Sequence, residues 1–361
     1  MKPKPTGSSQ PNFRTGPIRK KPLLIAGTVV VFILYSGWWV LTARTITSSA
    51  NSWITTEQAK GAKLAPDAVS VGGYPFTFTI KLQNVGLSWP SGLGFTAQNL
   101  KVNARPWAIR TFHINATGGV TVSLPSGDVR PALTFASQTL RGTAGFQDNA
   151  VPTALNLAAD TVSASLTGVE GDAGRELTIA TLKLQEIRPA TPPKADTDTA
   201  MDLSLEGLDL SAPVIEGNPL GSTIKKIGLH VQLMGVPPAT YDGVGLKAWR
   251  DAGGTINTPD LSIEWGALSF GGNGTLALDT NMQPEGAFSV HIAGYEQALD
   301  SLAAAGWIKM SGASLAKLAM GIAAQTGPDG RPTVKTPLTI QDRHISLGPA
   351  KLGQIPEIKL D

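Results

Sequence analysis

The hydrophobic and polar positions of this chain follow two different periods. An uncharged, mostly apolar run of twenty residues covers positions 22–41. At about 1.5 Å per residue, a helix of that length spans about 30 Å, which matches the hydrocarbon core of a bilayer. From residue 66 onwards, short alternations of apolar and polar residues are typical of half-buried strands, and Gly- and Pro-rich turns separate them. We therefore expect one transmembrane helix followed by a mainly β protein.

The charges that flank the apolar run predict its orientation. Residues 1–21 form a basic tail with six Lys or Arg residues and no acidic residue, whereas Arg44 is the nearest charge on the other side. This asymmetry places the N-terminus in the cytoplasm and the bulk of the chain across the membrane. The run is longer than a signal-peptide core of about 7–15 residues, and cleavage after Ala50 is the alternative. The residues expected to hold the anchor are Leu23, Leu24, Ile25, Val30, Phe32, Trp38 and Trp39.

Four segments are expected beyond the anchor. Residues 42–65 form a helical stalk, residues 66–188 a first β-rich half, residues 189–200 a Pro- and Asp-rich linker or loop, and residues 201–361 a second β-rich half with a few short helices. The short helices are expected at residues 244–252, stopped by Gly253, at residues 295–305, stopped by Gly306, and in a third segment with Leu315, Leu318 and Ile322 along one face. About a dozen strands with about three inward apolar residues each exceed what these three short helices can cover. The expected fold is therefore a large curved antiparallel sheet with an exposed apolar face, or a sandwich of two sheets. Candidate residues lining that face are Phe76, Phe78, Ile80, Leu82 and Trp265.

Composition narrows the possibilities further. The chain has 40 Gly and 26 Pro among 361 residues, which disfavours a helical bundle. It has no Cys, which excludes disulfide scaffolds, zinc ribbons and thiol nucleophiles. The net charge of +3 comes from the basic tail, because 24 basic and 27 acidic residues remain without it. No basic run of the kind that grips phosphates remains, so we expect no nucleic-acid partner.

The sequence offers no positive case for catalysis. Its four histidines are isolated, no paired histidines have metal-ligand spacing, and no G-x-S-x-G motif is present. A glycine pattern at residues 92–97 lacks the strand and helix of a dinucleotide site, and the acidic residues at 196–202 lack the Gly and Glu of a calcium loop. We expect no enzyme activity, no metal and no cofactor. The histidines are His113, His230, His291 and His344.

Several Gly-, Pro- and Trp-containing segments carry a family resemblance. They are residues 71–78 (VGGYPFTF), 249–254 (WRDAGG), 263–266 (IEWG), 274–279 (GTLALD), 347–349 (LGP) and 355–356 (IP). With them, residues 23–356 resemble domain-of-unknown-function family 2125, a set of uncharacterised Gram-negative envelope proteins. The anchor followed by a long β-meander also resembles, more distantly, AsmA-like envelope proteins, whose curved sheets have an apolar interior. The resemblances imply an envelope protein, and the AsmA-like one implies an association with lipid movement between membranes. With the anchor and the basic tail, we expect an inner-membrane protein with one membrane span and a periplasmic β-rich part.

Two hypotheses for function follow. In the first, the β-rich part binds a lipid or another apolar ligand next to the inner membrane and contributes to envelope maintenance or lipid transport. In the second, a closed β-sandwich acts as a structural scaffold of an envelope complex. An exported hydrolase ranks third, because it would need a polar cluster that only folding could assemble. The sequence leaves the ligand and any protein partner unidentified.

Overall fold

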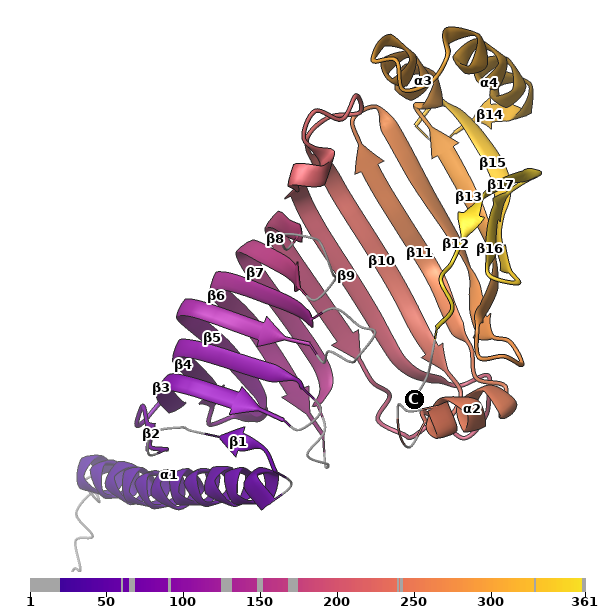
Figure 1. Ribbon diagram of the computed structural model, residues 1–361. Coiled ribbons are helices and arrows are strands. Elements are labelled where there is room, and N and C mark those ends of the chain that lie inside the picture. The colour runs from indigo at the N-terminus through magenta and orange to yellow at the C-terminus, as the bar shows by residue number, and fades with distance from the viewer. Residues whose placement is uncertain are drawn as a thin grey trace, which may run out of the picture.

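A computed structural model describes residues 20–59, 61–64, 69–89, 92–124, 132–147, 152–167, 175–238, 240, 243–327 and 329–358. It contains a long N-terminal helix, a large β-sheet and a few short helices (Figure 1). The helical elements are α1 (Lys20–Ala59), η1 (Pro213–Ile215), α2 (Gly243–Asp251), α3 (Tyr295–Ala304) and α4 (Met310–Ala323). The strands are β1 (Lys63–Leu64), β2 (Val71–Gly72), β3 (Phe78–Ser88), β4 (Gly94–Arg105), β5 (Ala108–Ser123), β6 (Ala132–Phe146), β7 (Pro152–Thr167), β8 (Arg175–Ile187), β9 (Thr199–Ser211), β10 (Ile224–Met234), β11 (Ile256–Trp265), β12 (Leu268–Leu278), β13 (Pro284–Ala293), β14 (Ala324–Thr326), β15 (Pro332–Gln341), β16 (His344–Leu347) and β17 (Ala350–Gln354).

All the described strands belong to one antiparallel sheet. From β3 to β13, each strand pairs with the next one along the chain. β13 then pairs with β15, the other side of β15 pairs with β14 and β16, and β17 extends β16. Within the described residues, β1 and β2 pair only with β3, so the sheet is open rather than closed into a barrel.

The two β-rich halves form one continuous sheet. Residues 189–200 were expected to be a linker or a loop; residues 188–198 connect β8 to β9, which pair with each other, and Thr199 already begins β9. The open sheet corresponds to the curved-sheet expectation, and the described strands do not form the second packed layer that a sandwich needs.

A line of unpaired residues crosses the sheet and bends it. On every strand from β3 to β10, one or two residues are skipped in the pairing register. Three of the skipped residues have positive φ without being Gly, namely Asn84, Thr161 and Asp209. The register shifts at Gly118 and Gly119 of β5 and at Lys225 of β10, as at β-bulges, which bend a strand and increase its twist. At Asn84, Thr161 and Asp209 the register is the same on both sides, and the positive φ marks the break in pairing. Figure 1 shows β3 to β8 as curved strands. This bend line consists of Asn84, Gln98, Gly118, Gly119, Gln138, Thr161, Ala180, Asp209 and Lys225.

The apolar residues on the two sides of the bend line pack against each other. Ala159 and Val162, which flank Thr161, are buried in one cluster with Ile179 and Leu210. Leu182 also packs against this cluster from beyond the bend in β8. The bend therefore has an apolar inner side, on which both parts of each strand contribute side chains. Full burial of the larger side chains, Val162, Ile179 and Leu210, stabilises the fold by about 1.5–3 kcal/mol each.

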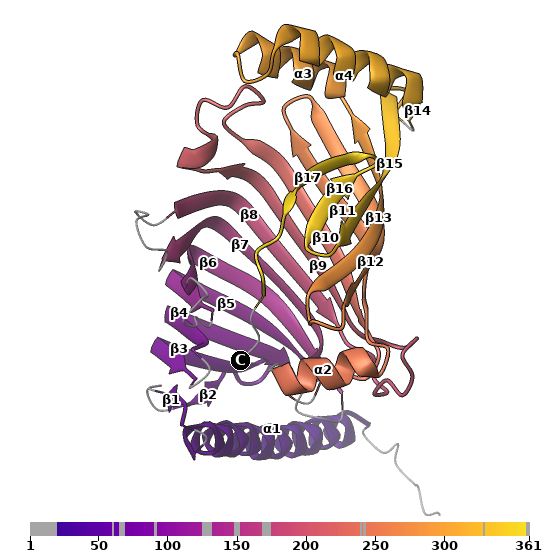
Figure 2. The same ribbon diagram turned by 45° about the vertical axis from the view of Figure 1, so that its right-hand side comes forward.

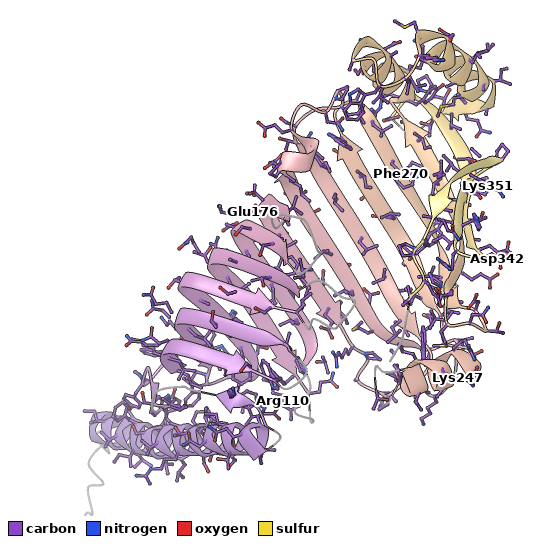
Figure 3. All side chains as sticks on the ribbon, in the orientation of Figure 1. Arg110, Glu176, Lys247, Phe270, Asp342 and Lys351 are labelled. Carbon is purple, nitrogen blue, oxygen red and sulfur yellow. The ribbon has the colours of Figure 1, made fainter. Side chains whose placement is uncertain are left out.

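Helices cover the two ends of this inner face. At the first end, the indole of Trp39 on α1 stacks on Phe78 of β3, with ring centroids 5.1 Å apart. At the other end, Tyr295 of α3 is buried with Ile292 and Val334 of the sheet. Figures 1 and 2 show α1 at one end of the sheet and the α3–α4 pair at the other. Phe270 packs against the cluster of Ile292, Tyr295 and Val334, and Figure 3 shows it on the broad face of the sheet.

The helices agree only in part with the sequence-based expectations. The expected anchor and stalk form one continuous helix, α1, and the short helices expected from residues 244 and 295 are α2 and α3. The expected helix with Leu315, Leu318 and Ile322 on one face is α4, but these three side chains are 64–81% exposed and do not pack on the sheet. α4 instead buries the small Ala313.

Candidate functional site: an open apolar face

A row of leucines crosses the middle of the inner face. Leu157 pairs with Leu184, Leu184 with Leu205, Leu205 with Leu229, and Leu229 with Leu261, so five consecutive strands each contribute one leucine. Directly opposed residues have their Cβ atoms about 4.5–5.5 Å apart, which brings these side chains into contact along the row. We call these five residues the leucine ladder.

The leucine ladder is only half-buried. Its five residues lie outside the hydrophobic clusters that the described residues form, whereas Leu182, two positions from Leu184 on the same face, packs against one. No described helix shares a hydrophobic cluster with the ladder, whereas α1 and α3 each share one with an end of the sheet. Partly exposed leucines in a continuous row form a candidate binding surface for an apolar ligand or partner.

The apolar row continues toward α1 through a gap. Val102 of β4 pairs with Ile114 of β5, and Gly142 of β6 separates Ile114 from Leu157. A Cβ atom at position 142 would lie 2.4 Å from the carbonyl oxygen of Asn156 and 2.6 Å from Leu157 Cδ2. Glycine is therefore required for the strands to approach here, and it leaves a notch in the apolar row.

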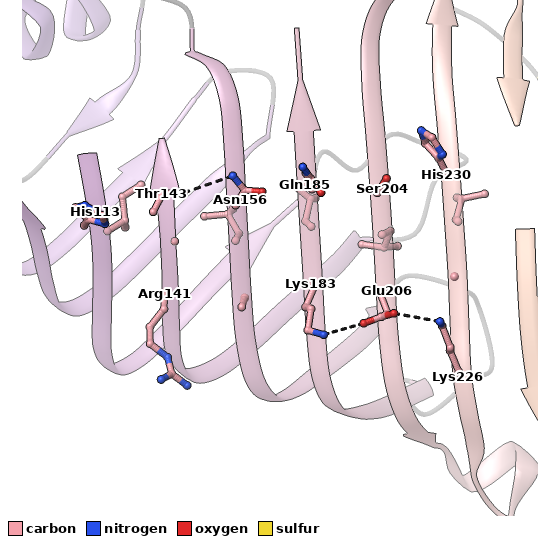
Figure 4. Close-up of a pocket in the computed structure, with 18 of the residues that line it drawn as sticks. His113, Arg141, Thr143, Asn156, Lys183, Gln185, Ser204, Glu206, Lys226 and His230 are labelled. Carbon is pink, nitrogen blue, oxygen red and sulfur yellow. Dashed lines mark hydrogen bonds and ion pairs between the residues drawn. The ribbon is translucent and has the colours of Figure 1, made fainter. Parts of the chain in front are cut away.

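The outer face of the same strands is polar. It holds an open depression of about 900 Å³ whose lining includes Arg141, Lys183, Glu206, Lys226 and His230 (Figure 4). Glu206 accepts from Lys183 Nζ at 2.8 Å and lies 3.2 Å from Lys226 Nζ, and these two bonds hold the pKa of the Glu206 carboxyl below its usual range. A carboxylate fixed between two lysines neutralises a polar surface and offers no free base for catalysis.

One histidine has a carboxylate partner. His230 Nε2 lies 2.9 Å from Asp202 Oδ1, and Gln232 donates to the other oxygen of Asp202 at 2.8 Å. Partial burial raises the pKa of Asp202, but the hydrogen bonds from Gln232 and His230 outweigh it and leave that pKa below its usual value. Among the described residues, no nucleophile is hydrogen-bonded to this pair, and no cluster of three His, Asp or Glu could hold a metal ion.

The structure separates the residues expected to line the apolar face. Phe78, Ile80 and Leu82 face Ala104, Val102 and Leu100 across β3 and β4, so they belong to the inner face. Phe76 differs from the expectation, because it lies in the turn before β3 and is 70% exposed. Trp265 ends β11, where its indole N–H donates to the Gly221 carbonyl at 2.8 Å.

Other functional residues carried weaker sequence signals. The members of the leucine ladder are isolated members of short alternations, and only pairing across strands aligns them. Trp107, in the two-residue turn between β4 and β5, is 70% exposed, although a tryptophan in a β protein is more often a core residue. The position of this Trp in a short turn between two strands is the sequence signal that could have predicted its exposure.

The anchor residues lie on α1, as expected. The basic tail lies outside the described residues, as do the side chains of Leu23 and Leu24. Ile25, Val30 and Phe32 are 54–65% exposed, so this part of α1 presents an apolar surface to its surroundings. Trp38 is 41% exposed, whereas Trp39 is buried. Among the described residues, α1 is the one helix long and apolar enough to cross a membrane.

Comparison with known proteins identifies a family and no characterised relative. A family model described as "Uncharacterized protein conserved in bacteria (DUF2125)" matches residues 39–356. Neither the curated proteins nor the solved structures give a significant match.

Proposed function

We propose that this chain, which belongs to the DUF2125 family of uncharacterised bacterial proteins, is a non-enzymatic membrane-anchored protein that holds the acyl chain of a lipid on its leucine ladder. The observation that carries the proposal is the uncovered ladder from Leu157 to Leu261 on the inner face of the sheet. Covering a contiguous apolar surface with an apolar ligand removes it from water, which is favourable, and such surfaces mark binding sites.

The size of the ladder fits an acyl chain. Its five strands have four spacings of about 4.8 Å, so the row is about 19 Å long. Half of a hydrocarbon core of about 30 Å is about 15 Å, so the ladder exceeds the length of chain in one leaflet. Each methylene buried against it contributes about 0.8 kcal/mol at most, and an open face buries only one side of the chain. Reversible binding is the expected result, which suits a protein that receives and releases lipid.

The anchor supplies the lipid source. In this proposal, α1 crosses the inner membrane with its N-terminus in the cytoplasm, and the sheet lies in the periplasm. The basic tail and the apolar run support this orientation. Tethering the sheet beside the bilayer raises the effective concentration of lipid at the ladder without a tight site. The role would be in maintenance of the envelope or in movement of lipid through it.

Neighbouring residues on opposite faces allow a matched test. A photoreactive amino acid is placed at Leu205 or Leu229 on the inner face, and at Ser204 or His230, which pair with each other on the outer face. The full chain is irradiated in its own membrane, and lipid adducts are measured by mass spectrometry. We expect lipid adducts at Leu205 and Leu229, and few at the two outer positions.

Two results would overturn the lipid proposal. Equal lipid adducts on both faces would mean that labelling reports only proximity to the membrane. Protein adducts at Leu205 and Leu229 with no lipid would favour the scaffold hypothesis, with the partner identified from the adduct.

A further inference from the structure

The turn between β2 and β3 contacts the apolar half of α1 through aromatic side chains. Residues 73–77 connect β2 to β3, and we call them the aromatic turn because they include Tyr74 and Phe76. Tyr74 OH lies 2.7 Å from Ser36 Oγ, and its ring makes edge contacts with Phe32 and Trp39 at centroid distances of 6.4 and 5.4 Å. These contacts of Tyr74 with Phe32, Ser36 and Trp39 fix the turn at one height along α1.

A further hydrogen bond and the backbone of the turn make this contact rigid. The hydroxyl of Tyr35 donates to the carbonyl oxygen of Pro75. Thr77 N–H closes the turn on the Gly73 carbonyl at 3.0 Å, and Gly73 has a φ of +96° with Thr77 Oγ1 where a Cβ would lie. The turn therefore needs glycine at position 73 and is held both by itself and by the helix.

These contacts lie inside the expected membrane span. Phe32, Tyr35 and Ser36 precede Leu41, the end of the apolar run, by nine, six and five residues. At about 1.5 Å per residue, they lie about 13, 9 and 8 Å below the outer boundary of the hydrocarbon core if α1 crosses upright. The aromatic turn touches the helix at that depth. Its residues carry no charge, and Phe76 presents 70% of its surface to the surroundings.

The direction of β3 along α1 determines how far its other residues lie from the expected membrane. Phe78 stacks on Trp39, and Trp89, just after β3, donates from Nε1 to Glu57 Oε2 at 3.2 Å. β3 therefore runs along α1 away from the membrane. Lys81 is three residues beyond Phe78, about 10 Å further out at about 3.3 Å per residue, which is the level of the headgroups.

Two lysines meet at that headgroup level. Lys81 and Lys101 are directly opposed on β3 and β4, and both are exposed. Opposed like charges destabilise a sheet in water, whereas anionic headgroups attract basic residues near a membrane surface. The pair is therefore favourable at this height and unfavourable elsewhere.

A second turn lies at the same end of the sheet. Ala104 of β4 pairs with Phe78, and the β4–β5 turn follows at once with Trp107, which is 70% exposed. Ile109 at the start of β5 is 46% exposed. Exposed tryptophan and isoleucine beside an exposed tyrosine and phenylalanine have the composition of a membrane interface.

We propose that the aromatic turn and the β4–β5 turn insert into the outer leaflet of the membrane that α1 spans, with Lys81 and Lys101 at the anionic headgroups; this inference rests on the proposed anchor. The aromatic turn lies directly before Phe78, the first residue of the inner face on β3, and the β4–β5 turn begins just after Ala104, which pairs with Phe78. The sheet thus meets the bilayer where its apolar face begins. An acyl chain from the outer leaflet would then reach the inner face without crossing water.

Depth-dependent quenching in liposomes tests the insertion. The chain has no Cys, so one cysteine at a time is introduced into the full chain and labelled with an environment-sensitive fluorophore. The variants are Phe76→Cys and Trp107→Cys in the turns, Phe32→Cys in the anchor, Lys81→Cys at the headgroup level, and Lys351→Cys on β17. The vesicles contain phosphatidylethanolamine, phosphatidylglycerol and a lipid that carries a spin label on its acyl chain or its headgroup.

The expected pattern separates the two proposals. Labels at Phe76→Cys and Trp107→Cys should be quenched by the acyl-chain spin label at least about twofold more than the label at Lys351→Cys. The label at Phe32→Cys should show the same excess quenching. The label at Lys81→Cys should be quenched by the headgroup spin label instead. Quenching at Phe32→Cys without quenching at Phe76→Cys and Trp107→Cys would overturn the insertion of the turns and leave the anchor standing. Absence of quenching at Phe32→Cys would overturn the anchor itself.

Discussion

At the residue scale, the position of a turn decides which of two similar side chains packs. Phe78 is 2% exposed, and it stacks on Trp39 at an interplanar angle of 16°. Phe76, two residues earlier, is 70% exposed because pairing with β4 begins only at Phe78. Hydrophobicity alone does not separate these two residues, but their energetic roles differ. Phe78 joins the helix to the sheet, and Phe76 is free to contact a surrounding phase.

The two phenylalanines form a matched pair for mutation. Phe78→Ala removes a fully buried ring and should lower the free energy of unfolding by about 3 kcal/mol or more. Phe76→Ala removes an exposed ring and should change it by less than about 0.5 kcal/mol. Denaturant unfolding of the full chain in one detergent, followed by circular dichroism of the strands, gives both values. Equal losses for the two variants would show that the stacking between α1 and β3 does not stabilise the sheet.

At the element scale, the bend line is the feature that the sequence did not predict. Alternation identified strands, and Gly253 and Gly306 marked the ends of α2 and α3, because both signals depend on local residues. A break in strand pairing depends instead on the neighbouring strand, because a residue is unpaired only in relation to its partners there. Thr161, with a φ of +53°, looks like an ordinary strand residue, since Thr is favoured in strands. Its neighbours Asp160 and Val162 both pair with β8, and only this pairing shows that Thr161 itself has no partner on that strand.

Strain at Thr161 predicts a stabilising substitution. A β-branched residue at positive φ is unfavourable, whereas Asn tolerates that conformation, as Asn84 does at φ +50° on the same bend line. Thr161→Asn should therefore raise the free energy of unfolding by about 0.5–1 kcal/mol. Thr178→Asn, an exposed position of β8 with regular pairing, should lower it by a similar amount because Asn is disfavoured in strands. Thermal unfolding of both variants beside the parent checks the opposite signs. A loss at both positions would mean that the backbone at Thr161 is not strained.

At the scale of the whole molecule, the open sheet explains why the sequence left two folds in play. A strand in a sandwich and a strand in an open curved sheet have the same period of two. What distinguishes them is whether a second layer covers residues such as Leu205, and coverage depends on contacts between distant segments. The end of the sheet shows the same dependence, because Ile292 is covered by α3 and Leu205 is not, although both lie in alternating strands. The family match and the fold were predictable from local patterns, and the uncovered face was not.

The orientation of the whole chain can be measured with single cysteines. Ser9→Cys lies in the basic tail and Glu176→Cys on an exposed position of β8. In cells stripped of their outer membrane, a membrane-impermeant maleimide should label Glu176→Cys at once and Ser9→Cys only after lysis, because the basic tail stays on the cytoplasmic side. The intact mass of the extracted protein should include residues 1–41. Labelling of Ser9→Cys in intact cells would reverse the topology, and a mass lacking residues 1–50 would replace the anchor by a cleaved signal peptide. Since the aromatic turn contacts Ser36, removal of those residues would also expose Phe78 and leave the first end of the apolar face uncovered.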